Sequence, residues 1–296
     1  MTVRGLQVNA IAITELLLHS NQQVDLIVIG GGPAGFMAAI TAAEMGTDSV
    51  LLLEATSKTL EKVRISGGGR CNVTHACWDP IELVTNYPRG KTPLLGAFSR
   101  FATGDAVAWF AEKGLKLVIE EDGRMFPSSN SSSEVISCLR NTARNVGVHC
   151  FTKSAVIQVD DLHNKGFLVY IQSQKPIETK RVLIATGGNS SGRKLAARLG
   201  HTIVKSVPSL FSLKLSTHAL KNCSGVAIND VKLKLLVGSK SFIESGRILI
   251  THWGFSGPAI LRLSAFAARE LNLTNYKAEL IINWINIDYT DASHLL

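Results

Sequence analysis

Residues 24–54 read VDLIVIGGGPAGFMAAITAAEMGTDSVLLLE. This stretch predicts a short apolar strand at 24–29, a turn whose Gly30, Gly32 and Gly35 fit G-x-G-x-x-G, a helix, and a second strand at 49–53. In such a turn the first glycine permits tight bending, the second lets the backbone approach phosphate, and the third lets the helix sit close to the sheet. The positive end of the helix then favours bound phosphate. The unit predicts a site for the pyrophosphate of a dinucleotide.

Glu54 closes the second strand, 19 residues after Gly35. A carboxylate there can accept hydrogen bonds from the hydroxyls of a ribose, and its charge disfavours a 2′-phosphate. The glycine pattern alone is weak evidence, because an ordinary glycine-rich turn before a helix would match it. The surrounding strand, helix, second strand and terminal acid, all in register, favour the nucleotide site.

Length and composition narrow the class of protein. A chain of 296 residues, of which 46% are hydrophobic and 18% charged, predicts two folded domains rather than a disordered chain. The best apolar run, at 10–18, is interrupted by Thr14 and Glu15 and falls short of the roughly 20 residues that cross a bilayer. Five cysteines without metal-binding spacing indicate a reducing compartment and no metal site. We therefore expect a cytoplasmic protein without a membrane partner.

The net charge of +8 raises the question of a nucleic-acid partner. The basic residues are scattered, no run of five occurs, and only 6% of residues are aromatic, so the sequence predicts no stacking platform. We expect a small-molecule substrate and no nucleic acid, since a positive field also favours ligands that carry phosphate or carboxylate. The oligomeric state is not predicted.

The segment from 56 to 86 has little periodicity and is expected to be a loop around RISGGGRCN at 64–72. Three consecutive glycines expose backbone N–H groups, and Arg64 and Arg70 can offer charge-assisted hydrogen bonds to an anion. The alternative is a flexible solvent turn. Further donors and acceptors in the segment favour a ligand role: Ser66, Cys71 and Asn72.

Beyond this loop the pattern alternates between helices and strands. Helices are expected at 98–113, 134–146 and 191–200, and strands at 154–159, 166–171 and 181–185. EDGRMFP at 121–127 predicts a turn that places Arg124 beside Phe126. The last strand runs into ATGG at 185–188, at the carboxyl edge where open α/β sheets bind their cofactors.

From His201 onward shorter strands, such as 233–237 and 247–250, predict a second, β-rich domain. Within it, THWGFSGPAILRLSAFAAREL at 251–271 predicts a helix that starts at Ser256–Pro258. The free N–H groups of that helix start are a candidate anion or carbonyl-oxygen site. The alternative is a plain buried helix, with His252 in the core.

Taken in order, GGGPAG, RISGGGRCNVTH, EDGRMFP, ATGG followed by LGHT, and THWGFSGPAILRLS carry a specific resemblance. Over residues 24–285 the chain resembles the aminoacetone-oxidase/BaiN-like family of FAD-dependent oxidoreductases. Residues 1–22 precede the first strand and are expected to be an N-terminal appendage. The resemblance implies an α/β fold with a glutathione-reductase-like Rossmann FAD-binding domain at 23–200 and an inserted β-rich substrate-side domain at 201–296. Members continue through a segment that returns to the FAD domain, so we expect this chain to be truncated, with the return segment missing and the inserted domain incomplete.

The resemblance implies an enzyme that transfers a hydride or electrons through FAD, with a reduced nicotinamide, NAD(P)H, or a small organic substrate. Two alternatives stay open: a non-catalytic remnant that binds the ADP half of FAD weakly, and an RNA-modification flavoprotein of related fold. No catalytic base is identified; candidates for the shell around the flavin are Arg70, Arg124, His252 and Ser256. The expected cofactor contacts are Gly30, Gly32, Pro33, Ala34, Gly35, Glu54, Ser66, Gly67, Arg70, Cys71, Asn72, Val156, Ala185, Thr186 and Gly187.

Overall fold

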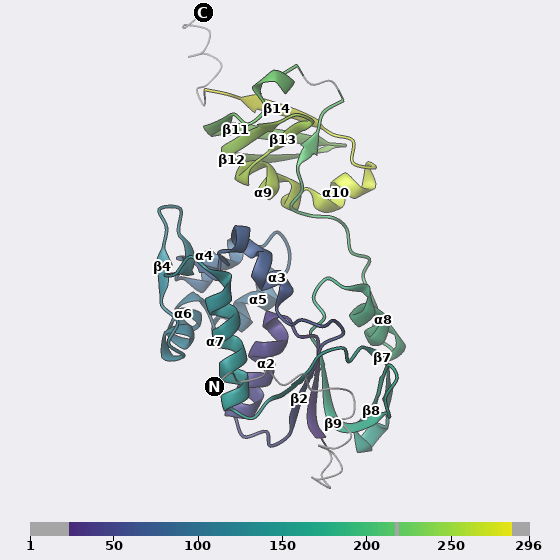
Figure 1. The fold of residues 1–296 in the computed structure, drawn as a ribbon. Helices are drawn as coiled ribbons and strands as arrows, with labels where there is room; N and C mark the ends of the chain where they lie inside the picture. Colours follow the sequence, from purple (N-terminus) through teal and green to yellow (C-terminus); the bar gives the residue numbers. More distant parts are fainter. Residues whose placement is uncertain (1–23, 217–218, 286–296) are drawn as a thin grey trace, which may run out of the picture. The chain divides into compact units, whose positions relative to one another are not determined.

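The computed structural model describes residues 24–216 and 219–285, and the chain divides into two compact units after Ile203 (Figure 1). The appendage expected at 1–22 lies outside the described residues. Within the described ranges, no helix has the length and apolar character needed to cross a membrane. The same residues contain no cluster of His, Cys, Asp and Glu side chains that could hold a metal ion.

A six-stranded sheet in the order β6-β2-β1-β9-β8-β7 forms the centre of the first unit. Its strands are β1 (Val24–Ile29), β2 (Val50–Leu53), β6 (His149–Phe151), β7 (Val156–Asp161), β8 (Phe167–Ile171) and β9 (Ile177–Ile184). The four strands β6, β2, β1 and β9 run parallel, whereas β8 and β7 continue the sheet antiparallel. The carboxyl ends of β2, β1 and β9 therefore meet at one edge.

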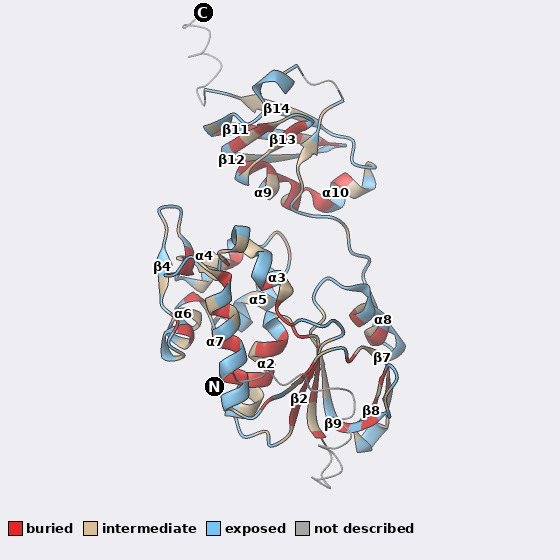
Figure 2. Ribbon diagram, viewed as in Figure 1, coloured by how far each residue is buried: buried red, intermediate tan, exposed pale blue. Residues whose placement is uncertain are grey.

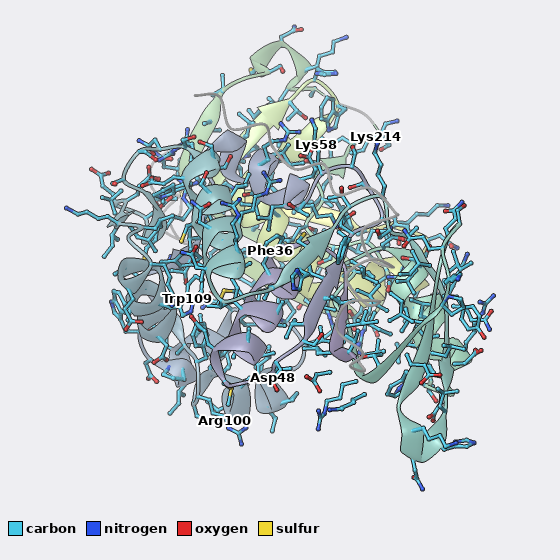
Figure 3. All side chains as sticks on the ribbon, turned by 60° about the horizontal axis from the view of Figure 1, so that its bottom comes forward. Phe36, Asp48, Lys58, Arg100, Trp109 and Lys214 are labelled. Atoms are coloured by element: carbon cyan, nitrogen blue, oxygen red, sulfur yellow. The ribbon has the colours of Figure 1, made fainter. Side chains whose placement is uncertain are left out.

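Both faces of the sheet are covered around β1 and β2, which explains why β2 is apolar throughout and β1 is apolar except at Asp25. Val28 of β1 packs with Phe36 of α2 (Pro33–Glu44) and with Leu139 of α7 (Ser132–Asn145) on one face. Its neighbour Ile27 points to the opposite face, where Leu195 of α8 (Ser190–Arg198) joins the core. Figure 1 shows α2 and α7 on one side of the sheet and α8 on the other, and Figure 2 shows buried residues on β2 and α2. Phe36 is labelled in Figure 3.

The remaining elements of this unit correct several predictions. The segment expected to be a loop contains α3 (Glu61–Ile65), a 3-10 turn (Ser66–Gly69), β3 (Thr74–His75) and α4 (Pro80–Thr85). The helix expected at 98–113 begins later, as α6 (Thr103–Glu112), and a separate helix that was not predicted, α5 (Lys91–Phe98), precedes it. The turn expected at 121–127 is in part a strand: residues 120–123 form the tip of a hairpin, and β5 (Arg124–Pro127) pairs with β4 (Leu117–Ile119) and β3 in a small sheet.

These elements escaped the sequence reading because most are too short to show a period. The break before α6 has a local cause, since the Asp105 carboxylate accepts the Ala102 N–H at 2.7 Å and starts a new helix. Strand β6 was also missed. It has only three residues, and it is held by pairing with β2, where Cys150 lies opposite Leu52.

The second unit confirms the expected β-rich architecture. Its antiparallel sheet has the order β10-β13-β12-β11-β14. The strands are β10 (Leu213–Lys214), β11 (Ala227–Val237), β12 (Lys240–Thr251), β13 (Gly254–Ser256) and β14 (Glu279–Asn283). Helices α9 (Pro258–Phe266) and α10 (Ala268–Leu273) pack on one face, and α9 begins at the expected proline.

Candidate functional site

A cavity of about 720 Å³ lies at the carboxyl edge of the first unit's sheet. Three segments line most of it: the turn after β1, the loop after β2, and the residues that follow β9. Side chains from the start of β7 and from α8 complete the wall. The volume lies within the roughly 300–1,000 Å³ range of small-molecule and cofactor sites.

The three glycines of the turn differ in what a side chain would meet, and only Gly30 and Gly35 are required by the fold. Gly30 has φ +116°, and a Cβ there would lie 2.5 Å from the Ala185 carbonyl oxygen. A Cβ on Gly35 would lie 2.0 Å from the carbonyl oxygen of Gly30, so only glycine lets α2 sit this close to β1. A Cβ on Gly32 would meet nothing within 4 Å. Gly32 therefore leaves open space at the start of α2, facing the cavity, as a phosphate site requires.

Glu54 lies in the cavity wall, and its carboxylate is oriented by the protein. One oxygen accepts the Gly31 N–H at 2.8 Å. The other accepts the Thr56 N–H at 2.8 Å and the Thr56 hydroxyl at 2.9 Å. Because a carboxylate offers about four lone-pair sites, these three bonds leave capacity for a ribose hydroxyl. The acid is thus held at the edge of the cavity in the place that the sequence pattern predicts.

Two cations in the cavity wall were missed by the sequence reading. Lys58 and Lys62 line the cavity and have no ion-pair partner among the described residues (Lys58 is labelled in Figure 3). The Lys62 ammonium lies near Gly187 and would be 3.7 Å from a Cβ built there. Their positive charge suits a pyrophosphate. The sequence does show two lysines four residues apart after Glu54, a spacing that would place both on one face of a helix. They were missed because that segment has no apolar periodicity.

Most of the expected cofactor contacts meet at this cavity. Those that line it are Gly30, Gly32, Pro33, Ala34, Glu54, Val156, Ala185, Thr186 and Gly187. Gly35 is buried beneath the turn. The expected contacts of the second glycine-rich segment, which are Ser66, Gly67, Arg70, Cys71 and Asn72, are not among the residues that line the cavity. Within that segment the Ser66 hydroxyl donates to the Val63 carbonyl at 2.8 Å, and burial raises the pKa of the Cys71 thiol.

Arg70 and Arg124 share protein partners on the small sheet. Arg70 donates to Asn130 at 2.8 and 3.0 Å, pairs with Glu120, and stacks 3.9 Å from the centre of the Phe126 ring. Arg124 pairs with the same Glu120 at 3.2 Å and lies 5.3 Å from the same ring. These contacts give Arg70 a packing role that the sequence did not predict.

His252 and Ser256 belong to the second unit. His252 meets Trp253 edge to face at 4.2 Å between ring centres, and the Ser256 hydroxyl accepts from the Ser212 hydroxyl at 2.8 Å. Helix α9 begins just after Ser256, and most of its length is buried in the core of this unit. The buried helix that was considered as the alternative is therefore present, but His252 is exposed and does not lie in the core.

A glycine turn after the first strand, an acid after the second and a cavity between them define a Rossmann-type, dinucleotide-binding α/β domain. The chain belongs to the HI0933-like family. The HI0933-like protein Rossmann domain matches residues 24–244, and the HI0933-like protein barrel and H2TH domain matches residues 207–292. These matches confirm the resemblance read from the motifs.

Two curated relatives extend the comparison. The chain is 30% identical over 254 residues to a 3-dehydro-bile acid delta(4,6)-reductase from Clostridium scindens, covering 82% of this chain and 60% of the relative. It is 26% identical over 256 residues to the ribosomal RNA dihydrouridine synthase of Escherichia coli, covering 83% of this chain and 61% of that protein. The chain thus spans about 60% of the length of both relatives.

A solved structure supports the fold. The open conformation of a flavocytochrome c3 fumarate reductase aligns with a TM-score of 0.52 at 20% identity, covering 75% of this chain and 50% of the other.

Proposed function

We propose that this chain binds FAD and belongs to an oxidoreductase that transfers a hydride or electrons through that cofactor. The cavity at the sheet edge is the observation that carries the proposal. Its residues fit the ADP half of FAD: Gly32 leaves space at a helix start for pyrophosphate, and Glu54 lies in the cavity wall with a lone-pair site left for a ribose hydroxyl. Lys58 and Lys62 add positive charge to the same wall.

When bound, FAD supplies a flavin ring that accepts a hydride. The work of this chain is to bind and orient the cofactor. The backbone at Ala185–Gly187 follows β9 into the same cavity and forms its wall beside the glycine turn. We propose a reduced nicotinamide or a small organic molecule as the electron donor. The name of the bile-acid reductase relative supports reductive chemistry on a small organic substrate.

The test is the flavin content of the purified full chain, together with titrations of FAD and ADP. We expect a flavin absorbance spectrum, and we expect Glu54→Gln to weaken ADP binding by about 1–2 kcal/mol because a charged acceptor becomes a neutral amide. A folded, colourless chain that binds ADP weakly would favour the remnant alternative. A folded chain that binds neither FAD nor ADP would overturn the proposal.

A second candidate function is the reduction of a base in RNA. It is favoured by the RNA-acting relative and by the charge of the second unit, which has ten Lys and Arg against four Asp and Glu between residues 204 and 285. Lys232 and Lys234 of β11 and Arg247 of β12 are exposed. The two lysines alternate with buried Val231, Leu233 and Leu235, so they lie on the sheet face opposite α9.

Binding of a labelled single-stranded RNA at several salt concentrations tests this candidate. Replacing Lys232 and Lys234 together by Glu should weaken binding and flatten its salt dependence, because phosphate contacts release counterions. The matched control replaces Lys221 and Lys277 of the same unit by Glu. RNA binding that is absent in the wild-type chain, or equal in both double variants, would exclude this face as an RNA site.

A further inference from the structure

The loop between β2 and α3 packs directly on the glycine turn. The Leu60 N–H donates to the Gly31 carbonyl at 2.8 Å, while the Gly31 N–H donates to Glu54. A Cβ on Gly31 would lie 2.9 Å from the Thr59 methyl group and 2.9 Å from the Glu54 Cβ. Loop and turn therefore form one packed body, and a shift of Thr59 would disturb both the phosphate turn and the acid.

Thr59 is held from outside the cavity by helix α7. The Arg140 Nε donates to the Thr59 hydroxyl oxygen at 3.0 Å, and its Nη2 donates to the same oxygen at 2.9 Å and to the Thr59 carbonyl at 3.2 Å. Thr59 is 4% exposed, so these bonds satisfy polar atoms that are shielded from water. Arg140 is itself exposed and does not line the cavity.

The backbone next to Thr59 needs such support. Leu60 has φ +62°, in the left-handed region that residues with a bulky side chain seldom adopt. Conformations of this kind persist where surrounding contacts over-determine them. Here those contacts are the bond from Leu60 to Gly31 on one side and the Arg140 contacts to Thr59 on the other.

We propose that Arg140 is a positioning residue for the nucleotide: by holding Thr59 against Gly31, it keeps the phosphate turn and Glu54 in their binding geometry without contacting the ligand. This inference rests on the proposed function of the cavity as an FAD site. Without Arg140 the loop samples other conformations, and the apparent affinity falls by the fraction of molecules that stay competent to bind.

The experiment titrates ADP into the full chain by isothermal calorimetry, well below its melting temperature. We expect Arg140→Met and Thr59→Val each to raise the Kd for ADP by about 5- to 20-fold. The double variant should bind no more weakly than the weaker single variant, because Thr59→Val removes only bonds that Arg140→Met also removes, namely those to the Thr59 hydroxyl. Arg140→Lys, which keeps the charge and one donor nitrogen, should regain part of the affinity.

Arg144→Met is the matched control. Arg144 lies one turn further along α7, is exposed, and donates to Asn141 of the same helix at 3.5 Å. We expect the Arg144→Met variant to bind ADP with the same Kd as the wild type. Equal Kd values for wild type and a folded Arg140→Met, even with a lowered melting temperature, would reduce Arg140 to a structural role and overturn the inference.

Three further outcomes separate the inference from the proposed function. If Arg140→Met does not fold, Thr59→Val decides, because its similar shape preserves the packing against Gly31 and unchanged affinity there would also overturn the inference. If the folded wild type binds neither ADP nor FAD, the proposed function fails and the inference falls with it. If the wild type binds and only the Arg140 effect is missing, the proposed function stands.

Discussion

Neighbouring glycines in the turn after β1 serve separate purposes. Gly35 is required by packing inside the protein, since its Cα faces the Gly30 carbonyl, whereas Gly32 faces open space in the cavity. Fold stability and ligand binding therefore depend on different atoms within six residues. A substitution at Gly35 should therefore affect fold stability, and one at Gly32 should affect ligand binding, each without the other.

We predict that Gly35→Ala destabilises the folded chain, because its new methyl group would lie 2.0 Å from a backbone oxygen that cannot move independently of β1. Gly32→Val should keep its melting temperature within a few degrees and lose ADP binding, because the branched side chain fills the space for phosphate. Thermal melts without ligand and ADP titrations check both. A stable Gly35→Ala variant, or unchanged ADP affinity in Gly32→Val, would contradict the assignment.

Arg70 is expected to contribute to stability as well as to any ligand contact. Arg70→Ala should lower the free energy of unfolding by about 1–2 kcal/mol, because it removes the bonds to Asn130 and Glu120 and the stacking on Phe126. Arg64→Ala is the control, since its guanidinium pairs with Glu61 on the exposed surface of one short helix. Urea denaturation of ligand-free protein measures both. If both variants have the same free energy of unfolding, the packing role assigned to Arg70 is wrong.

Among the secondary-structure elements, the strands of the first sheet are joined by polar contacts at the amino-terminal end of β1. The Asp25 carboxylate accepts the Lys180 ammonium of β9 at 2.6 Å and the Ser49 N–H, just before β2, at 3.1 Å. One side chain thus ties three adjacent segments together at the end of the sheet opposite the cavity. The Lys180 ammonium holds the pKa of Asp25 below its usual range.

This contact predicts a pH dependence. Because the folded-state pKa of Asp25 is depressed, its contribution is complete above the unfolded-state pKa of about 4 and is lost as the pH falls through the folded-state value. Asp25→Asn should therefore destabilise the chain by about 1 kcal/mol at pH 7, and the difference from wild type should shrink below pH 4. Urea denaturation of both proteins at several pH values between 2 and 7 measures this difference in the free energy of unfolding. Asp48→Asn, which changes an exposed acid just before β2, is the control and should show no such trend.

The molecule divides into two compact units, and every residue that lines the cavity lies between Ile29 and Leu195. The proposed ADP site is therefore contained in the first unit. We predict that a fragment of residues 1–203 folds and binds ADP with a Kd within about threefold of the full chain. Near-ultraviolet circular dichroism checks folding, and calorimetry checks affinity. A folded fragment that binds tenfold more weakly would show that the second unit contributes to the site.

The local sequence was sufficient for features that depend on a few adjacent residues. The glycine spacing, the strand at 24–29, the helix after it and the acid at Glu54 were all predicted, because turn sterics and the apolar period act over short distances. The same holds for the start of α9, where proline fixes the first helical residue.

Contacts between distant segments could be known only from the folded chain. Strand β6 exists because β2 lies beside it, and Arg70 packs on Phe126 because a hairpin 50 residues later folds back against it. The Arg140 contact spans 81 residues to reach Thr59, and no periodic pattern encodes such a pair. The sequence by itself determines local features, such as tight turns, helix starts and charged side chains. The partners of long side chains are decided only by the tertiary structure, because they depend on how helices and loops pack in three dimensions.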